Sequence, residues 1–206
     1  MLDQFSRLDP ETPRRVEWQL PTRTEGRAAR MKVILMAAVT IDGKIARHEH
    51  HFVDWSSKED KKLFMQTSKR AGVVILGNNT FETFPSPLPG RLHVVLTTNV
   101  TDKPQQPGEI EFTDRSPQEI VADLEGRGYT EAVLTGGAQV NALFLAANMV
   151  DEIWLTVEPH IFGLGIDLFR GVPFDLRATL LEVRQLNEGG SVLLRYGMIK
   201  PDTPTS

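Results

Sequence analysis

The chain has 206 residues, of which 40% are apolar and 24% are charged, and its formal net charge is −4. This length is enough for one well-filled domain, the negative charge argues against a nucleic-acid surface, and the lack of cysteine excludes disulfide bonds and thiolate metal sites. No apolar run approaches the roughly 20 residues that cross a bilayer, and the N-terminus lacks the basic-then-apolar order of a signal peptide, so we expect a cytoplasmic protein without membrane contact.

The two ends of the chain differ from its middle. Residues 1–30 mix proline, arginine and glutamate without sustained periodicity, which predicts an irregular N-terminal arm. Residues 201–206 (PDTPTS) predict a short disordered tail, and residues 31–200 are expected to form one domain. Within it, HEHH at 48–51 is the one cluster that suggests histidine metal ligands, and we expect a mobile loop there and no metal site.

The domain begins with two buried strands separated by a loop and a helix. MKVILMAAVT (31–40) and AGVVILG (71–77) are apolar, β-branched runs typical of strands buried on both faces. IDGKIA (41–46) predicts a loop, and a helix is expected to begin near Ser57.

The alternation of strand and helix then continues. NNTFETF (78–84) predicts a short helix, PSPLPG (85–90) a turn-rich loop, and RLHVVLTT (91–98) a third strand. SPQEIVADLEGRG (116–128) carries a complete helix-start signal, with Ser116 as N-cap followed by proline and glutamate.

The last third predicts two more strands and an antiparallel end. EAVLT (131–135) and DEIWLTVEP (151–159) are strand patterns, and GGAQVNALFLAANM (136–149) runs from a glycine pair into a helix. TLLEVRQLNEGGSVLLRYGMI (179–199) predicts a hairpin. Together these elements predict an α/β fold of three layers, with a mainly parallel central sheet, an antiparallel C-terminal edge, and helices on both faces.

Asp60 interrupts the apolar face of the first helix. On a helical projection it shares that face with Leu63, Phe64, Thr67 and Ala71. A buried, unpaired carboxylate shifts its pKa or finds a partner, which makes it a site candidate. The alternative is structural, because SKED (57–60) is a capping box in which Asp60 reaches back to the first free amide.

Three strand-to-helix or strand-to-loop junctions could hold a phosphate, since ligands of open α/β sheets bind beyond the carboxyl ends of strands. The residues concerned are Gly77, Asn78 and Thr80 at one junction, Thr97 and Thr98 at a second, and Gly136 and Gly137 at a third. Two glycines also suit a structural turn, and threonine is equally common as an N-cap. Both GxGxxG and the P-loop pattern are missing.

Few other residues suggest chemistry. Arg91 follows a rigid turn and could bind an anionic group or lie on the surface. Strand alternation places Trp154 and Thr156 on one face, so Thr156 could neighbour Asp60. With no catalytic triad order in the sequence, Asp60 is the one convincing ionisable group, which fits chemistry supplied mostly by a cofactor.

Taken together, these junctions resemble the dihydrofolate reductase superfamily over residues 31–199. In that family a tryptophan stands five residues before the active-site acid and an aromatic residue four residues after it, as do Trp55, Asp60 and Phe64 here. WLT (154–156) resembles the strand whose threonine, here Thr156, bonds the acid. The resemblance implies an NADPH-dependent reductase in which Trp55, Asp60 and Thr156 serve catalysis and Phe64 contacts the substrate.

The same resemblance implies contacts with the cofactor and with the tail of the substrate. LGNNTFETFPSPLPGR (76–91) implies that Thr80 touches NADPH and that Arg91 holds a substrate carboxylate. LTGGA (134–138) resembles a glycine pair, often joined by a cis peptide, against the pyrophosphate, and AAVTIDGKIA (37–46) resembles a flexible loop over the nicotinamide. The expected cofactor-binding residues are Ala38, Ile45, Gly77, Asn78, Thr80, Thr97, Thr98, Gly136, Gly137, Ala138 and Gln139.

Other stretches resemble the reductase domain of riboflavin biosynthesis, which reduces a ribosylaminopyrimidine phosphate. Three stretches are closer to that branch: TIDGKIA, GGAQVNALFLAANMVDEI and EPHIFGLGIDLF. In an enzyme of that branch, Lys44 and Arg91 would bind the ribose phosphate of the substrate. Against it, PSPLPGR stands where that branch usually has DDPxLTxR. No deaminase domain precedes the reductase pattern, so we do not expect a bifunctional enzyme.

Two positions depart from the folate branch. Asn78 stands where an arginine often helps to hold the 2′-phosphate of NADPH, and Asn141 replaces an aromatic residue near the nicotinamide. Three hypotheses follow: a dihydrofolate reductase, which we favour; a 5-amino-6-(5-phosphoribosylamino)uracil reductase; and a nucleotide-binding protein without turnover. The exposed edge and IFGLGIDLF (161–169) could mediate a homodimer.

Overall fold

The computed structural model describes residues 30–200, so the predicted tail and, apart from Arg30, the predicted arm lie outside the described residues. An eight-stranded sheet runs through the domain in the order β5-β4-β3-β6-β1-β7-β10-β9, and a separate pair joins β2 and β8. The strands are β1 (Lys32–Thr40), β2 (Lys44–Ala46), β3 (Val73–Gly77), β4 (Leu92–Leu96), β5 (Ile110–Thr113), β6 (Glu131–Leu134), β7 (Glu152–Glu158), β8 (Ile166–Asp167), β9 (Ala178–Gln185) and β10 (Val192–Met198). The helices are α1 (Lys58–Ala71), α2 (Asn78–Glu82), α3 (Pro117–Gly126) and α4 (Ala138–Ala146).

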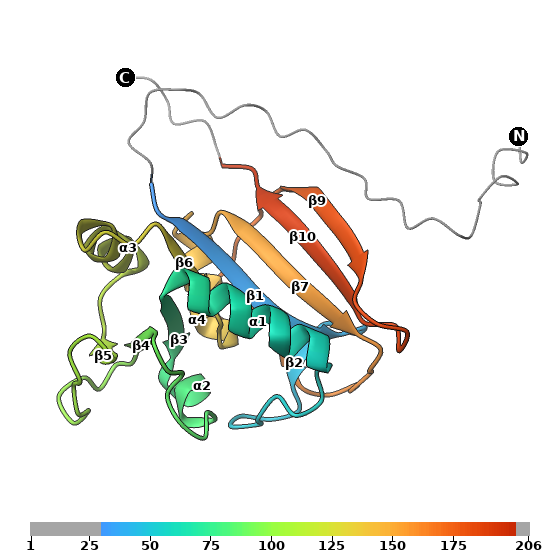
Figure 1. The fold of residues 1–206 in the computed structure, drawn as a ribbon, viewed down its shortest axis with the longest axis horizontal. Helices are drawn as coiled ribbons and strands as arrows, with labels where there is room; N and C mark the ends of the chain where they lie inside the picture. The colour runs from blue at the N-terminus through green and yellow to red at the C-terminus, as the bar shows by residue number, and fades with distance from the viewer. Residues whose placement is uncertain (1–29, 201–206) are drawn as a thin grey trace, which may run out of the picture.

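The strand directions confirm the predicted fold class. Neighbouring strands from β5 across to β7 are parallel, whereas β10 runs antiparallel to both β7 and β9. Helices lie on both faces of the sheet, with α1 on one side and α4 on the other (Figure 1). This is a three-layer α/β arrangement with an antiparallel edge.

The core divides into two clusters because successive side chains of a strand point to opposite faces. In β1, Val33 and Leu35 pack in the cluster that contains Phe144 of α4, whereas Ile34 and Met36 pack in the cluster that contains Ala71 of α1. Both sets are almost completely buried. A strand covered on both faces must be apolar at every position, which is why the strands were visible in the sequence as continuous apolar runs.

Three strands were not predicted from the sequence: β2, β5 and β8. β2 has three residues and β8 two, which is too short for a pattern to be read, and the four residues of β5, IEFT, are of mixed polarity. Their formation depends on partners that are distant in the sequence, as when β5 pairs with β4 through His93 and Ile110, or β2 with β8.

Candidate active site

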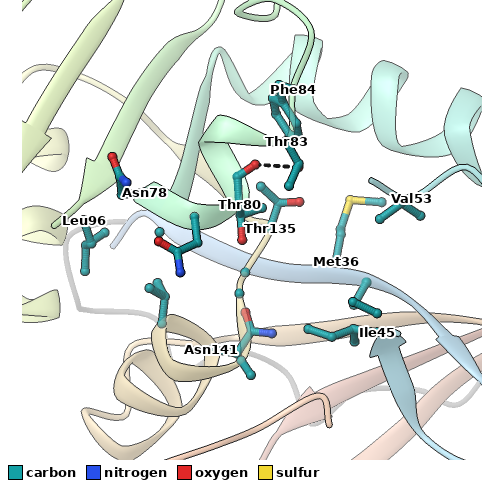
Figure 2. A pocket seen from close by; sticks show the side chains of 18 of the residues that line it. Met36, Ile45, Val53, Asn78, Thr80, Thr83, Phe84, Leu96, Thr135 and Asn141 are labelled. Carbon is teal, nitrogen blue, oxygen red and sulfur yellow. Dashed lines mark hydrogen bonds between the residues drawn. The ribbon is translucent and has the colours of Figure 1, made fainter. Parts of the chain in front are cut away.

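A cleft of about 1060 Å³ lies along the carboxyl ends of the parallel strands. The strand ends that line it include Ala38 of β1, Gly77 of β3, Leu96 of β4 and the residues directly after β6. Figure 2 shows Asn78 and Leu96 at one side of this pocket and Val53, Met36 and Ile45 at the other. The position is the one expected for a ligand of an open α/β sheet.

Most of the residues predicted for the site line this cleft. They are Ala38, Ile45, Asp60, Phe64, Gly77, Asn78, Thr80, Thr97, Thr98, Gly136, Gly137, Ala138, Gln139 and Thr156. They come from seven separate segments of the chain, and the sheet brings them together.

Asp60 occupies the first turn of α1 and faces the cleft. Its backbone amide donates to the hydroxyl of the N-cap Ser57 over 3.2 Å. The other half of the predicted capping box is not made by Asp60, because the backbone amide of Ser57 donates instead to Oε1 of Glu158 over 2.7 Å. The Asp60 carboxyl is therefore not used to cap the helix, and Asp60 lines the cleft.

The surroundings of the Asp60 carboxyl favour its protonated form. Burial raises its pKa above the ordinary value of 3.8, and the negative charge of Glu158 adds to this, while the hydroxyls of Thr156 and Ser56 act in the opposite direction. The Ser56 hydroxyl is buried without a hydrogen-bond partner in the described part of the chain. Both hydroxyls are close enough to the carboxyl to stabilise its charged form.

Glu158 is a functional neighbour that the sequence reasoning missed. This side chain is 2% exposed, and Ser191 of the residues before β10 donates its hydroxyl to Oε2 over 2.5 Å. Trp154, Thr156 and Glu158 occupy alternate, buried positions of β7, so the strand alternation that placed Trp154 and Thr156 together could also have found Glu158. Its two hydrogen bonds anchor the start of α1, and its charge acts on Asp60.

The glycine pair after β6 forms a narrow passage in the middle of the cleft. The Gly136–Gly137 peptide bond is cis, as the resemblance implied, and the amide of Gly77 donates to the Gly136 carbonyl over 2.7 Å. A Cβ built on Gly137 would lie 3.1 Å from Oγ1 of Thr80, and one built on Gly77 would lie 3.1 Å from Cγ2 of Val140. The absent side chains thus keep open a space that a ligand can enter.

The start of α4 offers this space unpaired backbone amides. Gly137 is the N-cap and has no side chain to bond the first amides of the helix, and both Ala138 and Gln139 line the cleft. The free N–H groups and the helix dipole favour an anion here. The residues present therefore fit the pyrophosphate of a dinucleotide.

Three predicted site residues lie outside the lining of the cleft. Arg91 is 5% exposed, and its guanidinium donates to the backbone carbonyls of Pro89 over 3.1 Å and of Met65 over 2.9 Å. Lys44 forms an ion pair with Asp167 between β2 and β8. These placements differ from expectation, since we assigned both charged groups to the substrate. In the structure, backbone carbonyls bind the guanidinium of Arg91, and Asp167 binds the ammonium group of Lys44.

Trp55 also lies away from the cleft. Its ring packs edge-on against Phe162 and His160, with centroids 5.0 and 6.0 Å apart, and its Nε1 is buried without a partner in the described residues. In this position the tryptophan packs the segment before α1 against the residues that follow β7.

The comparisons with known proteins agree with this geometry. Residues 31–192 match the sequence model of the RibD C-terminal domain. The chain belongs to the RibD C-terminal domain family. It is also 31% identical over 135 residues to the dihydrofolate reductase HdrB of Haloferax volcanii, covering 63% of this chain and 68% of the relative.

A further relative and two solved structures extend the likeness. The uncharacterized protein YwjB of Bacillus subtilis is 28% identical over 171 residues, covering 80% of this chain and 97% of the relative. The deaminase/5-amino-6-(5-phosphoribosylamino)uracil reductase of Thermotoga maritima has a TM-score of 0.69 at 20% identity, over 82% of this chain and 57% of the other. The dihydrofolate reductase of Enterococcus faecalis complexed with NADP(H) has a TM-score of 0.60 at 22% identity, over 82% and 97%.

These findings confirm the predicted superfamily, the fold and the class of protein, an oxidoreductase. Within this RibD C-terminal domain, the two departures noted from the sequence are side chains of the cleft wall. The Asn78 amide donates to Oε1 of Glu82 over 2.7 Å, and the Asn141 amide donates to the Leu168 carbonyl over 3.1 Å. The carbonyl oxygens of both side chains are buried without a partner in the described residues, so both retain an acceptor for a ligand.

The HEHH segment also borders the cleft. His48, Glu49, His50 and His51 all line it, but among residues 30–200 no group of three or more side chains is arranged to hold a metal ion. Two of its side chains lie near charged residues of other segments: His50 is 4.0 Å from Glu82 of α2, and Glu49 is 3.9 Å from Arg170 after β8. In the same described range, no helix is long and apolar enough to cross a membrane.

Proposed function

We propose that this RibD C-terminal domain is an NADPH-dependent reductase of a planar heterocycle of the pterin or aminopyrimidine type. The observation that carries the proposal is the partly buried carboxyl of Asp60 beside the hydroxyl of Thr156, in the same cleft as the glycine passage at the start of α4. The first feature suits an amino-substituted ring and the second suits a dinucleotide phosphate.

The residues of the chain would hold the cofactor at two points. Gly136, Gly137 and the first amides of α4 would bind the pyrophosphate, while Ala38 and Ile45 would lie against the nicotinamide, which supplies a hydride when the cofactor is bound. The relative complexed with NADP(H) supports this choice of cofactor at the level of the fold.

Asp60 would orient the substrate and assist its protonation. A carboxylate offers two acceptor oxygens, which match two neighbouring N–H donors on the edge of an aminopyrimidine ring. Burial raises the pKa of Asp60, so its carboxyl holds a proton more readily than an exposed one. A proton shared between this group and the ring would raise the basicity of the atom that is protonated as the ring accepts the hydride. Thr156 would hold the carboxyl in place.

Dihydrofolate is the substrate to test first, since the relative with 31% identity is a dihydrofolate reductase. The ring of the substrate would lie between Asp60 and Phe64, which both line the cleft. Binding of a tail carboxylate by Arg91 stays a prediction, because the guanidinium is engaged by Pro89 and Met65 in this structure.

The ribosylaminopyrimidine phosphate of riboflavin biosynthesis is the second candidate. The match to the RibD C-terminal domain over residues 31–192 favours it, and its aminopyrimidine ring presents the same kind of edge to Asp60. A role for Lys44 in binding its phosphate would require the pair with Asp167 to open.

The test is NADPH oxidation by the purified full chain with each substrate, comparing wild type with Asp60→Asn. We expect turnover with one of them and a loss of about 10²-fold or more in Asp60→Asn, which lessens at low pH where the substrate is already protonated. Glu59→Gln is the matched control, since Glu59 is an exposed neighbour on α1 bonded to Asn187. Cofactor binding without turnover of either substrate would instead support the nucleotide-binding hypothesis.

A further inference from the structure

The end of β7 carries a buried acidic side chain that the proposed reaction does not use. Glu158 is the last residue of this strand and is 2% exposed, and it does not line the cleft. Burying a charged group is costly unless hydrogen bonds or opposite charges compensate it. The partners of Glu158 therefore indicate what this side chain does.

Both carboxyl oxygens of Glu158 accept hydrogen bonds. The backbone amide of Ser57, the N-cap of α1, donates to Oε1 over 2.7 Å, and the hydroxyl of Ser191 donates to Oε2 over 2.5 Å. Ser191 is 2% exposed and directly precedes β10. Neither partner carries a positive charge, so these bonds satisfy the oxygens of Glu158 without neutralising its charge.

The turn between β9 and β10 fixes the hydroxyl of Ser191. The side chain of Asn187 donates to this hydroxyl over 3.0 Å and accepts the backbone amide of Ser191 over 3.2 Å. Because a hydroxyl has a single proton to donate, the proton of Ser191 is left for Glu158. Asn187 also bonds Glu59, but this contact is exposed and is therefore worth little.

These contacts end beside Asp60. The hydroxyl of Ser57 accepts the backbone amide of Asp60 over 3.2 Å, so the residue that Glu158 holds also caps the turn that carries Asp60. Figure 1 shows the start of α1 near the end of β7 and the turn between β9 and β10. Burial is the main cause of the raised pKa of Asp60; the charge of Glu158 raises it further, whereas Lys61 lowers it.

A second glutamate of β7 shows what a purely structural group looks like. Glu152 occupies a buried position on the same face of the strand, but Lys32 and Arg195 pair with it and neutralise its charge. At Glu158, hydrogen bonding alone would be served by a neutral glutamine, whose oxygen also accepts the Ser57 amide. An uncompensated charge kept next to another carboxyl lowers stability and is typical of functional sites.

We propose that Glu158 and Ser191 are positioning residues of the reaction, which hold the first turn of α1 so that the carboxyl of Asp60 faces the substrate ring. This assignment rests on the proposed function, because it takes Asp60 to be the group that binds the ring. It gives the β9–β10 hairpin a part in the reaction, although Ser191 does not line the cleft. The charge of Glu158 also favours the protonated form of Asp60.

The first measurement titrates the Asp60 carboxyl in the full chain by ¹³C NMR, with aspartate labelled at the side-chain carboxyl and Asp60→Asn to identify the signal. Glu158→Gln keeps the size of the side chain and an acceptor for Ser57 but removes the charge. Without this charge Asp60 loses its proton at lower pH, so we expect the midpoint of its titration to fall. A merely structural role of Glu158 would leave this midpoint unchanged.

The second measurement is the pH profile of kcat/KM with the substrate that is turned over. In Glu158→Gln we expect the alkaline limb of this profile to move to lower pH, and kcat/KM to fall by roughly 10- to 100-fold because Asp60 is misplaced. Ser191→Ala keeps the charge and removes one hydrogen bond, so a smaller loss of about 3- to 10-fold is expected. The affinity for NADPH should stay unchanged in both variants.

Glu152→Gln is the matched control, since it replaces a buried glutamate on the same strand and face. It should lower the melting temperature without moving the titration of Asp60. If Glu158→Gln also leaves the titration and the pH profile as in wild type, the assignment is overturned while the proposed function stands. Should Glu158→Gln not fold, an unchanged kcat/KM in Ser191→Ala overturns it. If wild type turns over neither substrate, the proposed function fails and the assignment fails with it.

Discussion

Asp60 stands in the first turn of α1, where the hydroxyl of Ser57 accepts the backbone amide of Asp60 itself. The sequence left two roles open for Asp60. It could cap the helix as part of SKED, or it could be a site residue on the apolar face of the same helix. The structure separates them, because Ser57 caps the helix and Glu158 bonds the amide of Ser57. Glu158 is 101 residues from Ser57 in the chain, so this outcome could not be predicted from SKED alone.

A buried carboxyl with a raised pKa lowers the stability of the fold at neutral pH. An acid whose pKa rises on folding binds protons more tightly in the folded state, so the free energy of unfolding falls as pH rises from 3.8 through the raised pKa. Asp60→Asn removes this charge. We expect the variant to melt at a higher temperature than wild type at pH 7, with the difference shrinking toward pH 4.

Thermal unfolding of both proteins across this pH range checks the prediction. Glu59→Gln serves again as the control, because Asn187 lowers the pKa of the exposed Glu59 and its replacement should give no such gain. An Asp60→Asn variant that is less stable than wild type at every pH would show that the carboxylate is a structural group after all.

The glycine passage allows a second test at the level of single residues. Gly137 has φ −71° and ψ −163°, which alanine also adopts, so Gly137→Ala changes mainly the space beside Thr80. The added Cβ would sit 3.1 Å from Oγ1 of that residue and intrude where the pyrophosphate is expected. We expect about 10- to 100-fold weaker NADPH binding, the equivalent of an overpacking cost of about 1–3 kcal/mol, measured by fluorescence titration.

Gly126→Ala is the matched control for this substitution. Gly126 is the last residue of α3, and nothing lies within 4 Å of a Cβ built on it. Alanine there should leave coenzyme binding unchanged and stabilise the helix slightly. Equal coenzyme affinity in Gly137→Ala and wild type would contradict the placement of the pyrophosphate.

At the scale of the elements, His93 of β4 holds the proline-rich loop that forms one wall of the cleft. It is 1% exposed, its Nε2 accepts the amide of Leu88 over 2.9 Å, and its Nδ1 lies 3.1 Å from the Glu109 carbonyl. These partners require a neutral imidazole with the proton on Nδ1. Burial lowers the pKa of His93 below its ordinary value of 6.5.

This environment predicts a dependence of stability on pH. Below pH 6.5 the unfolded chain protonates His93 while the folded chain keeps it neutral, so the free energy of unfolding decreases as pH falls until the lowered pKa is reached. His93→Gln should remove this part of the pH dependence and cost about 1–3 kcal/mol through weakened buried hydrogen bonds. Urea unfolding at pH 7.5 and 5.5 measures both effects.

His51, the other histidine with a lowered pKa, lies on the HEHH segment and supplies the comparison. His51→Gln should change the pH dependence little, because this ring bonds Arg47 near the surface rather than a buried amide. A larger change for His51→Gln than for His93→Gln would refute the argument from burial.

The long strands could be predicted from continuous apolar, β-branched runs, and the helices α1, α2, α3 and α4 from cap residues, apolar spacing and flanking glycines. The capping box of Ser116 and Glu119 is present as the sequence indicated. Periodicity could not show that Arg91 and Lys44 turn toward partners of the protein itself, since Met65 and Asp167 are brought beside them by packing.

At the scale of the whole molecule, the lateral order of the strands arranges the site. Consecutive strands such as β6 and β7 are not neighbours, because β1 lies between them. Because of these crossover connections, three features follow one another along the cleft: the glycine passage after β6, the end of β1, and Asp60 with Thr156 of β7. The sequence indicated which junctions carry chemistry. Their order across the sheet depends on these crossovers and came from the structure.

The exposed edge of the sheet supports the predicted homodimer, which stays a prediction. β9 is the outer strand, and its Val183 is 52% exposed. In the segment before β8, Ile161 is 71% and Leu164 88% exposed. An open edge and clustered apolar side chains favour association with a second copy. Light scattering after size-exclusion chromatography should give twice the chain mass of 23.1 kDa.

Two variants distinguish the surfaces that could form this dimer. Val183→Lys places a charge on the edge strand, and Leu164→Lys places one on the loop before β8. The variant that gives a monomer at the same protein concentration identifies the interface, and the other serves as its control, since both positions are exposed. Wild type that elutes with the mass of a single chain at every concentration would rule the homodimer out.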